Sequence, residues 1–359
     1  MTAPSFGRFF LPGPTDVHPE VLAAMQRPMI GHRSGAMEQL LAGLEPQLAR
    51  LFRTRRTVLV GTTSATGFME MAVRNGVRKR ALSLVNGSFS DRFAHLVQAC
   101  GKECVRVEVP LGCAVEPDML RDALRRTPVD AVTLVHSETS TGVLQDVEAL
   151  AAVVREFDDV LLLVDAVTSV AGSPVETDRW AFDFVFTGSQ KALALPPGLA
   201  LGVASERMLE RAKTLPHRGL YFDLVSFTAA MAKHQPTNTP AVSLLFALAA
   251  QLGRIDREGG VEARWRRHET MRARVEAWCA ERGVSYVPRE GRRSWTVSCL
   301  KLPDGKNSKA VVGGLKEAGW TIGAGYGALK ETTIRIGHMG DHTVAALEEL
   351  LGLVGELVA

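Results

Sequence analysis

The feature that most constrains the fold of this chain is a regular alternation between short apolar segments and amphipathic ones. Between residues 57 and 205, apolar runs typical of buried strands alternate with stretches in which apolar residues recur at helical spacing. Polar loops rich in small residues follow several of the apolar runs. This pattern is typical of an α/β fold with a mostly parallel, doubly wound sheet. Since ligands bind such sheets at the carboxyl ends of the strands, we expect these loops to gather at one functional edge.

The chain is also long enough for more than one folding unit. Its 359 residues accommodate two domains with ample core. We predict an N-terminal arm over residues 1–15, a large domain over 16–250 and a smaller C-terminal α+β domain over 251–359. The arm can reach a partner subunit, but a plain surface connection is the simpler expectation. The arginines of the helix expected over 262–282 are most simply a solvated face.

Composition narrows the class of protein. Hydrophobic residues make up 46% and charged residues 23% of the chain, which is ordinary for a soluble enzyme. The net charge of +3 gives no reason to expect nucleic-acid or membrane partners. The five cysteines lack paired metal-ligand spacing and are typical of free thiols in a reducing compartment. Without a signal pattern or a membrane-length apolar run, we expect a cytoplasmic protein with no metal site.

Two of the polar loops carry residues with specific chemistry. Asp165 ends one apolar segment, and Lys191 lies just beyond the next one, before a Pro-Pro-Gly turn. A lysine and an aspartate that face one another across a crevice suit pyridoxal phosphate, which needs an amine for its Schiff base and a carboxylate for its pyridinium nitrogen. Taken singly, the lysine could be an ordinary loop residue and the aspartate a helix N-cap. Together with the neighbouring loops, they favour the cofactor.

Other loops at the expected edge offer further contacts. The small-residue turn with Ser64 and Thr66 joins a strand to a helix, so its N–H groups and hydroxyls could hold a phosphate or simply cap the helix. Phe89 lies at another strand-to-helix turn, where its ring could lie on a cofactor ring or fill the core. Arg335, in the middle of an apolar strand, needs an anionic partner, which a substrate carboxylate or a protein carboxylate would supply.

With these residues in view, the chain resembles the class V, fold type I, aminotransferases that depend on pyridoxal phosphate. It is most similar to the serine–pyruvate and alanine–glyoxylate group. The resemblance covers nearly the whole chain, and the order and spacing of its motifs make it specific. These motifs are Leu11-Pro-Gly-Pro-Thr15, Gly31-His-Arg-Ser34, Ser64-Ala-Thr-Gly67, His136-Ser-Glu-Thr-Ser-Thr-Gly-Val-Leu144, Val164-Asp-Ala-Val-Thr-Ser169, Gly188-Ser-Gln-Lys191 and Ile334-Arg-Ile-Gly-His-Met-Gly340.

The resemblance implies a role for each motif residue. Lys191 would carry the cofactor and shuttle the proton, Asp165 would pair with the pyridinium nitrogen, and Arg335 would bind the substrate carboxylate. It also implies a homodimer with the active site at the subunit interface. The other cofactor contacts that it implies are Ser64, Ala65, Thr66, Ser189 and Gln190 at the phosphate, Phe89 stacked on the ring, Thr139 near the ring hydroxyl, and Thr237 and Asn238 from the partner chain.

Two positions depart from the pattern of the family. His338 stands where leucine is common, and its proximity to Arg335 could alter the polarity of the pocket and so the choice of substrate. Ala65 stands where glycine is frequent in the phosphate loop. Neither change removes a catalytic group. We therefore expect His338 to contribute to substrate binding together with Arg335.

The activity that the resemblance implies is transfer of an amino group from alanine or serine to a 2-oxo acid, glyoxylate or pyruvate. A single Arg335 fits a substrate with one carboxylate, although Arg33 or Arg218 could enter for a second. Aminoethylphosphonate, ureidoglycine and aspartate stay open as alternative donors on the same scaffold, and a non-catalytic cofactor-binding subunit is a further alternative. A cysteine desulfurase is disfavoured because Gln190 precedes Lys191 and the late glycine-rich loop lacks a cysteine.

Overall fold

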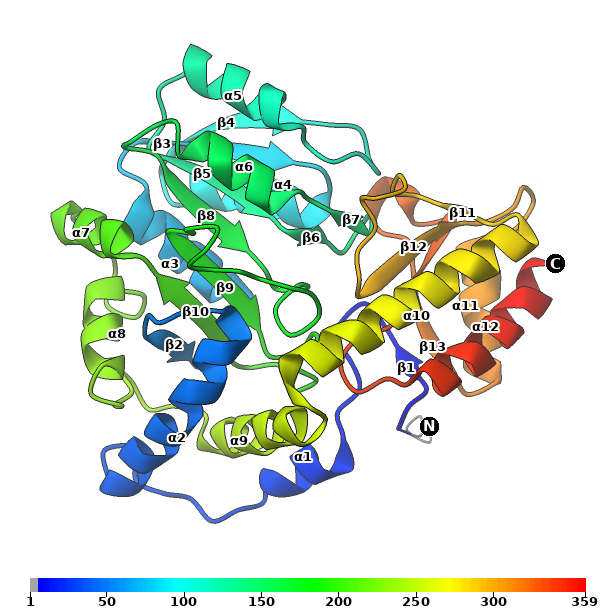
Figure 1. Cartoon of the computed structure of the whole chain (residues 1–359), viewed down its shortest axis with the longest axis horizontal. Helices are drawn as coiled ribbons and strands as arrows, with labels where there is room; N and C mark the ends of the chain where they lie inside the picture. Colours follow the sequence, from blue (N-terminus) through cyan, green and yellow to red (C-terminus); the bar gives the residue numbers. More distant parts are fainter. Residues whose placement is uncertain (1–5) are drawn as a thin grey trace.

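A seven-stranded sheet forms the centre of the larger part of the molecule (Figure 1). The computed structural model describes residues 6–359. The strands lie in the order β2-β10-β9-β8-β5-β3-β4, and all pairs from β9 to β4 are parallel, whereas β10 runs antiparallel to both neighbours. The predicted α/β architecture with a mostly parallel sheet is confirmed. The strands are β2 (Val58–Gly61), β3 (Arg80–Val85), β4 (Glu103–Glu108), β5 (Ala131–Val135), β8 (Leu161–Asp165), β9 (Phe184–Gly188) and β10 (Ala200–Ala204).

Helices join the strands and pack against this sheet (Figure 1). α3 lies against β8, β9 and β10, and α4 lies against β3, β4 and β5. A short hairpin of β6 (Ser137–Glu138) and β7 (Val143–Leu144) follows β5. The helices of this part are α1 (Pro19–Ala24), α2 (Gly35–Phe52), α3 (Ala65–Gly76), α4 (Ser88–Ala99), α5 (Pro117–Arg126), α6 (Val147–Val154), α7 (Glu206–Thr214), α8 (Leu224–Met231) and α9 (Val242–Arg257).

A second, five-stranded sheet lies beside the first, at the right of Figure 1, with three helices packed around it. Its order is β1-β13-β14-β12-β11, and β1 pairs with β13 in parallel. The segment predicted as an N-terminal arm thus supplies an edge strand to the C-terminal sheet. The elements are β1 (Phe9–Phe10), α10 (Gly260–Arg282), β11 (Ser285–Tyr286), β12 (Val297–Lys301), α11 (Ser308–Glu317), β13 (Thr321–Ala324), a 3-10 turn (Gly327–Leu329), β14 (Thr333–Gly337) and α12 (Val344–Val358).

Each sheet has a hydrophobic core of its own. The larger core surrounds the seven-stranded sheet and includes Phe68, Leu163 and Phe186. The smaller core includes Phe10 from the N-terminal segment together with Ile334 from β14. The predicted domain boundary near residue 250 falls inside the continuous helix α9, so the division at that residue stays a prediction.

Arg264 on α10 does not belong to a solvated face, contrary to the expectation for this helix. Its side chain is fully buried, where it forms an ion pair with Asp341 and donates to the Ala192 carbonyl over 3.0 Å. A buried guanidinium requires such partners because an unpaired charge away from water is costly. Periodicity could not reveal them, since they come from segments distant in the sequence. The contact ties α10 to the residue directly after Lys191.

Candidate active site

The carboxyl ends of β8 and β9 bring Asp165 and Lys191 to one pocket. Asp165 is the last residue of β8 and pairs in register with Phe186 of β9, and Lys191 follows the end of β9 at Gly188. Both ionisable side chains are buried. The pocket has a volume of about 500 Å³, counting the part open to solvent, and its lining consists of Ser64, Ala65, Thr66, Met69, Phe89, Arg92, Val135, Ser137, Thr139, Asp165, Val167, Thr168, Gln190 and Lys191.

Burial brings the pKa values of Asp165 and Lys191 close to one another. Burial, together with the charge of Glu138, raises the pKa of Asp165 to about 7, although the backbone N–H of Val167 donates to it over 2.9 Å. Burial, followed by the charge of Arg335, lowers the pKa of Lys191 to about 8. An amine with such a pKa loses its proton at little cost near neutral pH, as a nucleophile and proton carrier must.

The N-terminal segment closes over Lys191, so it is not a plain surface connection. The lysine Nζ donates to the carbonyl of Pro12, and the N–H of Thr15 donates to the Gln190 carbonyl over 3.0 Å. Gly13 has a φ of +123°, and a Cβ there would lie 2.6 Å from Lys191 Nζ. A glycine is therefore required at this position both by its backbone conformation and by the close approach.

The N-terminus of α3 forms one end of the pocket. α3 begins at Ala65, with Ser64 as an extended N-cap whose side chain makes no capping bond. Within residues 6–359, the backbone N–H groups of Ala65 and Thr66 have no acceptor. Unpaired N–H groups at a helix N-terminus, beside two hydroxyl groups, are what a phosphate requires. This end of the pocket therefore fits the phosphate of pyridoxal phosphate.

An aromatic ring and two hydroxyl groups line the middle of the pocket. Phe89, in the first turn of α4, has its ring centroid 5.8 Å from Lys191 Nζ and 5.1 Å from Arg92 Cζ. The hydroxyl groups of Thr139 and Thr168 lie 2.6 Å apart. Together with the carboxyl group of Asp165, these side chains give the pocket an aromatic ring, hydroxyl groups and an acid, which suit the binding of a pyridinium ring.

Arg335 lies beside the pocket without a protein carboxylate. Its Nε donates to the Ala324 carbonyl over 2.9 Å and its Nη1 to the Thr139 carbonyl over 3.2 Å, and its Cζ lies 5.3 Å from the ring centroid of Tyr326. In the described part of the chain, no carboxylate oxygen lies within 4.0 Å of its nitrogens. Burial lowers the pKa of this guanidinium. A half-buried cation with spare N–H donors is suited to an anionic ligand.

The structure does not bring every predicted site residue to this pocket. The Ser189 hydroxyl donates to the Pro196 carbonyl over 2.8 Å, which shapes the loop around Lys191. His338 is fully buried and lies 2.9 Å from the Ser298 hydroxyl through Nε2, outside the lining, and burial lowers its pKa to about 3. Within one chain, Thr237 and Asn238 line a separate hollow that also includes Thr62 and Tyr221.

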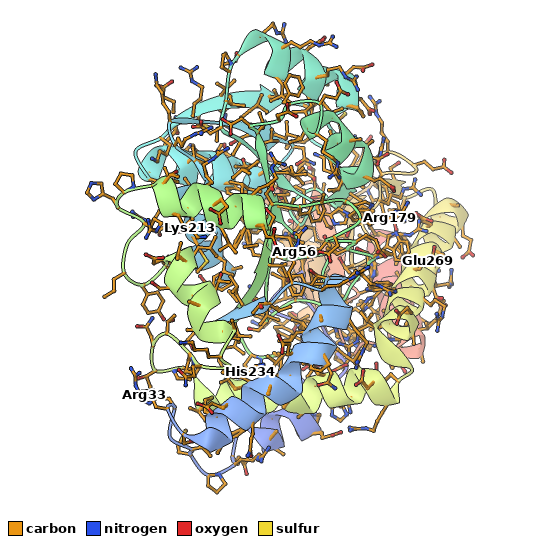
Figure 2. All side chains as sticks on the ribbon, turned by 60° about the vertical axis from the view of Figure 1, so that its left-hand side comes forward. Arg33, Arg56, Arg179, Lys213, His234 and Glu269 are labelled. Carbon is orange, nitrogen blue, oxygen red and sulfur yellow. The ribbon has the colours of Figure 1, made fainter. Side chains whose placement is uncertain are left out.

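Sequence reasoning missed two charged groups near the predicted residues. Arg92 lines the pocket, one helical turn after Phe89. Glu138 is completely buried and accepts hydrogen bonds from the first turn of α4 and from Ser140. The helical spacing from Phe89 could have indicated Arg92. Glu138 stands in the polar loop after β5, but only the fold shows that α4 supplies its donors. Figure 2 places Arg33 on the periphery, in the segment before α2.

The fold and this site define the class of protein. Residues 9–340 match the aminotransferase class V family, and the chain belongs to that family. Members of this family with this fold bind pyridoxal phosphate, and the pocket described above fits that cofactor. The chain is thus a pyridoxal-phosphate-dependent aminotransferase, as its motifs predict.

Particular relatives support the same class. An aminotransferase of Methanocaldococcus jannaschii is 36% identical over 92% of this chain and 87% of its own. The L-aspartate–glyoxylate aminotransferase of Paracoccus denitrificans is 33% identical over 94% of this chain and 87% of its own. The crystal structure of an alanine–glyoxylate aminotransferase from Nostoc sp. superposes with a TM-score of 0.94 at 28% identity, covering 100% of this chain and 97% of that one. Among the described residues, no helix has the length and apolar character needed to cross a membrane.

Proposed function

We propose that this aminotransferase moves an amino group from a small amino acid, alanine or serine, to glyoxylate or pyruvate. The observation that carries the proposal is the buried Lys191 and Asp165 in one pocket, with Arg335 beside them and no carboxylate of residues 6–359 on its guanidinium. A cation free of protein carboxylates fits a substrate with one carboxylate group. The alanine–glyoxylate aminotransferase of the same fold supports this choice of substrates.

In this proposal each residue has one task. Asp165 would pair with the protonated ring nitrogen, and α3 would hold the phosphate through the N–H groups of its first turn. When bound, pyridoxal phosphate supplies an electron-accepting ring for the electrons of the substrate Cα–H bond. Lys191 would hold the cofactor through its amine, and that amine, when free, would accept and return the substrate Cα proton. Arg335 orients the substrate carboxylate so that the Cα–H bond lies near Lys191.

The absorption spectrum of the purified protein tests the function. We expect a visible band from the lysine-bound cofactor, and we expect that band to be lost when alanine or serine is added without a 2-oxo acid. Other amino acids, added singly, rank the donors. A band that persists with alanine and serine would overturn the donor assignment. A protein that gives no band after incubation with pyridoxal phosphate would overturn the cofactor site.

Aspartate is the second candidate donor, and one observation favours it. Arg92 lines the pocket and, within residues 6–359, makes no ion pair with a carboxylate. A second cation near the cofactor site could hold the side-chain carboxylate of a dicarboxylic donor. The aspartate–glyoxylate aminotransferase among the relatives supports this alternative. If the visible band is lost at lower concentrations of aspartate than of alanine, aspartate is the preferred donor.

We expect Arg335→Gln to lower kcat/KM for the amino donor by about 10- to 150-fold, since a charge-assisted hydrogen bond contributes roughly 1.5–3 kcal/mol. The loss should appear mainly as a higher KM, because the carboxylate is held in the ground state as well as in the transition state. Steady-state kinetics with alanine measure it. Arg179→Gln, at an exposed position, is the matched control. Unchanged KM values in the Arg335 variant would contradict the role.

We further propose a homodimer in the cytoplasm. Thr237 and Asn238 lie in a hollow next to Tyr221, and Leu220 beside it is 94% exposed, so this region offers apolar surface to a second copy. In the dimer these two residues would reach the phosphate of the other subunit. The five free cysteines favour a reducing compartment. Sedimentation equilibrium tests the dimer, and a mass of one chain at micromolar concentration would contradict it.

A further inference from the structure

The buried Glu138 connects two parts of the active site, although it does not line the pocket. It lies on β6, directly before Thr139, and its side chain has no exposed surface. Oε2 accepts from the backbone N–H groups of Phe89 and Ser90 over 3.1 and 2.9 Å, and from the Ser90 hydroxyl over 3.0 Å. Oε1 accepts from the N–H and hydroxyl of Ser140 over 3.1 and 2.6 Å. The carboxylate thus joins the first turn of α4 to the segment after β5.

The backbone at Gly87 packs closely against Glu138 and Ser140. A Cβ on Gly87 would lie 2.4 Å from Glu138 Cγ and 2.5 Å from the Ser140 hydroxyl. That hydroxyl also accepts from the backbone N–H of Ser88 over 3.0 Å. The N-terminus of α4 is therefore held at several points by the same short segment. At this helix N-terminus, the N–H groups of Phe89 and Ser90 find their acceptor on Glu138, and that of Ser88 on Ser140.

Both ends of this connection belong to the site. On one side, Phe89 carries the ring that lines the pocket, and its own N–H is one of the Glu138 donors. On the other side, Thr139 lines the pocket with its side chain, and its carbonyl accepts from Arg335 over 3.2 Å. A shift of the Glu138 side chain would therefore move the aromatic wall relative to Thr139 and Arg335.

We propose that Glu138 is a positioning residue that sets the Phe89 ring against the cofactor by anchoring the N-terminus of α4 to β6. This role deepens the proposed function and rests on it. A carboxylate accepts at both oxygens, whereas an amide accepts at only one. Because backbone N–H groups donate to both Glu138 oxygens, a glutamine must turn its own N–H₂ toward one set of donors in either orientation. Glu138→Gln thus preserves the shape but breaks the connection.

The test compares Glu138→Gln with the wild-type holoenzyme and with Glu148→Gln, the same chemical change at an exposed position. We expect Glu138→Gln to reduce the circular dichroism of the bound-cofactor band and to speed cofactor release. We expect kcat/KM to fall about 5- to 150-fold, the loss that an unsatisfied buried donor produces, mainly through kcat. Far-UV circular dichroism should be unchanged. A Glu138 variant with the wild-type cofactor signal and release rate would overturn the proposal.

A double-mutant cycle separates positioning from general destabilisation. If Glu138 acts through the ring, its substitution should change cofactor release much less in a Phe89→Ala background than in the wild type. Full additivity would overturn the proposal. Ser140→Ala removes one donor to Glu138 and should give a smaller change of the same kind, which keeps the test valid if Glu138→Gln does not fold. Failure of the wild type to bind pyridoxal phosphate would instead refute the proposed function.

Discussion

Replacement of Lys191 by alanine is expected to lower turnover by about 10⁴-fold or more while leaving the fold intact. The loss has two physical sources. The cofactor loses its covalent attachment, and the site loses the amine that carries the Cα proton. The fold should persist because the substitution removes a buried amine whose pKa burial has already lowered to about 8, so its burial opposes folding rather than driving it. Single-turnover and steady-state kinetics measure the loss of turnover, and thermal unfolding measures whether the fold persists.

Lys213→Ala is the matched control, since this lysine is exposed on α7 and forms an ion pair with Glu210. It should leave turnover unchanged. The Lys191 variant should still bind pyridoxal phosphate non-covalently, with a spectrum close to that of the free aldehyde. Near-normal turnover in the Lys191 variant would falsify the assignment of this lysine.

Replacement of Asp165 by asparagine is expected to weaken cofactor binding by about two to four orders of magnitude, because leaving a buried charge without its partner costs roughly 3–5 kcal/mol. The same change should stabilise the protein without cofactor. Burial raises the folded pKa of Asp165 from 3.8 to about 7, so its ionisation costs on the order of 4 kcal/mol at pH 8, and asparagine avoids that cost. Equilibrium binding and urea unfolding at pH 8 measure the two opposite effects.

The pH dependence of stability and of cofactor affinity follows from the raised pKa of Asp165. Since the folded pKa lies above the unfolded value, Asp165 destabilises the cofactor-free protein as pH rises from about 4 to about 7. Cofactor binding requires the ionised carboxylate, so wild-type affinity should fall about tenfold per pH unit below 7. In Asp165→Asn this part of the pH dependence should be absent. Asp158→Asn, on an exposed loop, is the control. An identical pH profile in both variants would contradict the pairing role.

Local sequence patterns predicted the larger sheet well and missed elements whose partners lie elsewhere. The alternation between residues 57 and 205 predicted a mostly parallel sheet, and the pairs from β9 to β4 are parallel. α8 was missed although Asp223 caps it and Leu224 and Phe227 are buried on one side. β1 has two residues, so its pairing with β13 could not be read from periodicity. A strand of two residues forms because it pairs with a neighbouring strand, here β13.

The predicted site residues also differ in how well local sequence placed them. Lys191, Asp165, Phe89 and Thr139 stand at strand ends or strand-to-helix turns, and the structure gathers them in one pocket. His338 follows the arginine strand in sequence but points to Ser298, because residues adjacent along the chain need not share surroundings.

Local sequence patterns are sufficient to predict the parallel sheet, the edge at which the polar loops meet, and the residues that can react there. These depend on local periodicity and on the chemistry of single side chains. The surroundings of the reactive groups depend instead on tertiary contacts: Pro12 against Lys191, the Glu138 carboxylate against α4, and Asp341 on buried Arg264. Each of these contacts joins segments far apart in the chain. Each contact offsets the cost of taking a polar or charged group out of water, and the partner that offsets it comes from a distant segment, so no single segment contains the information.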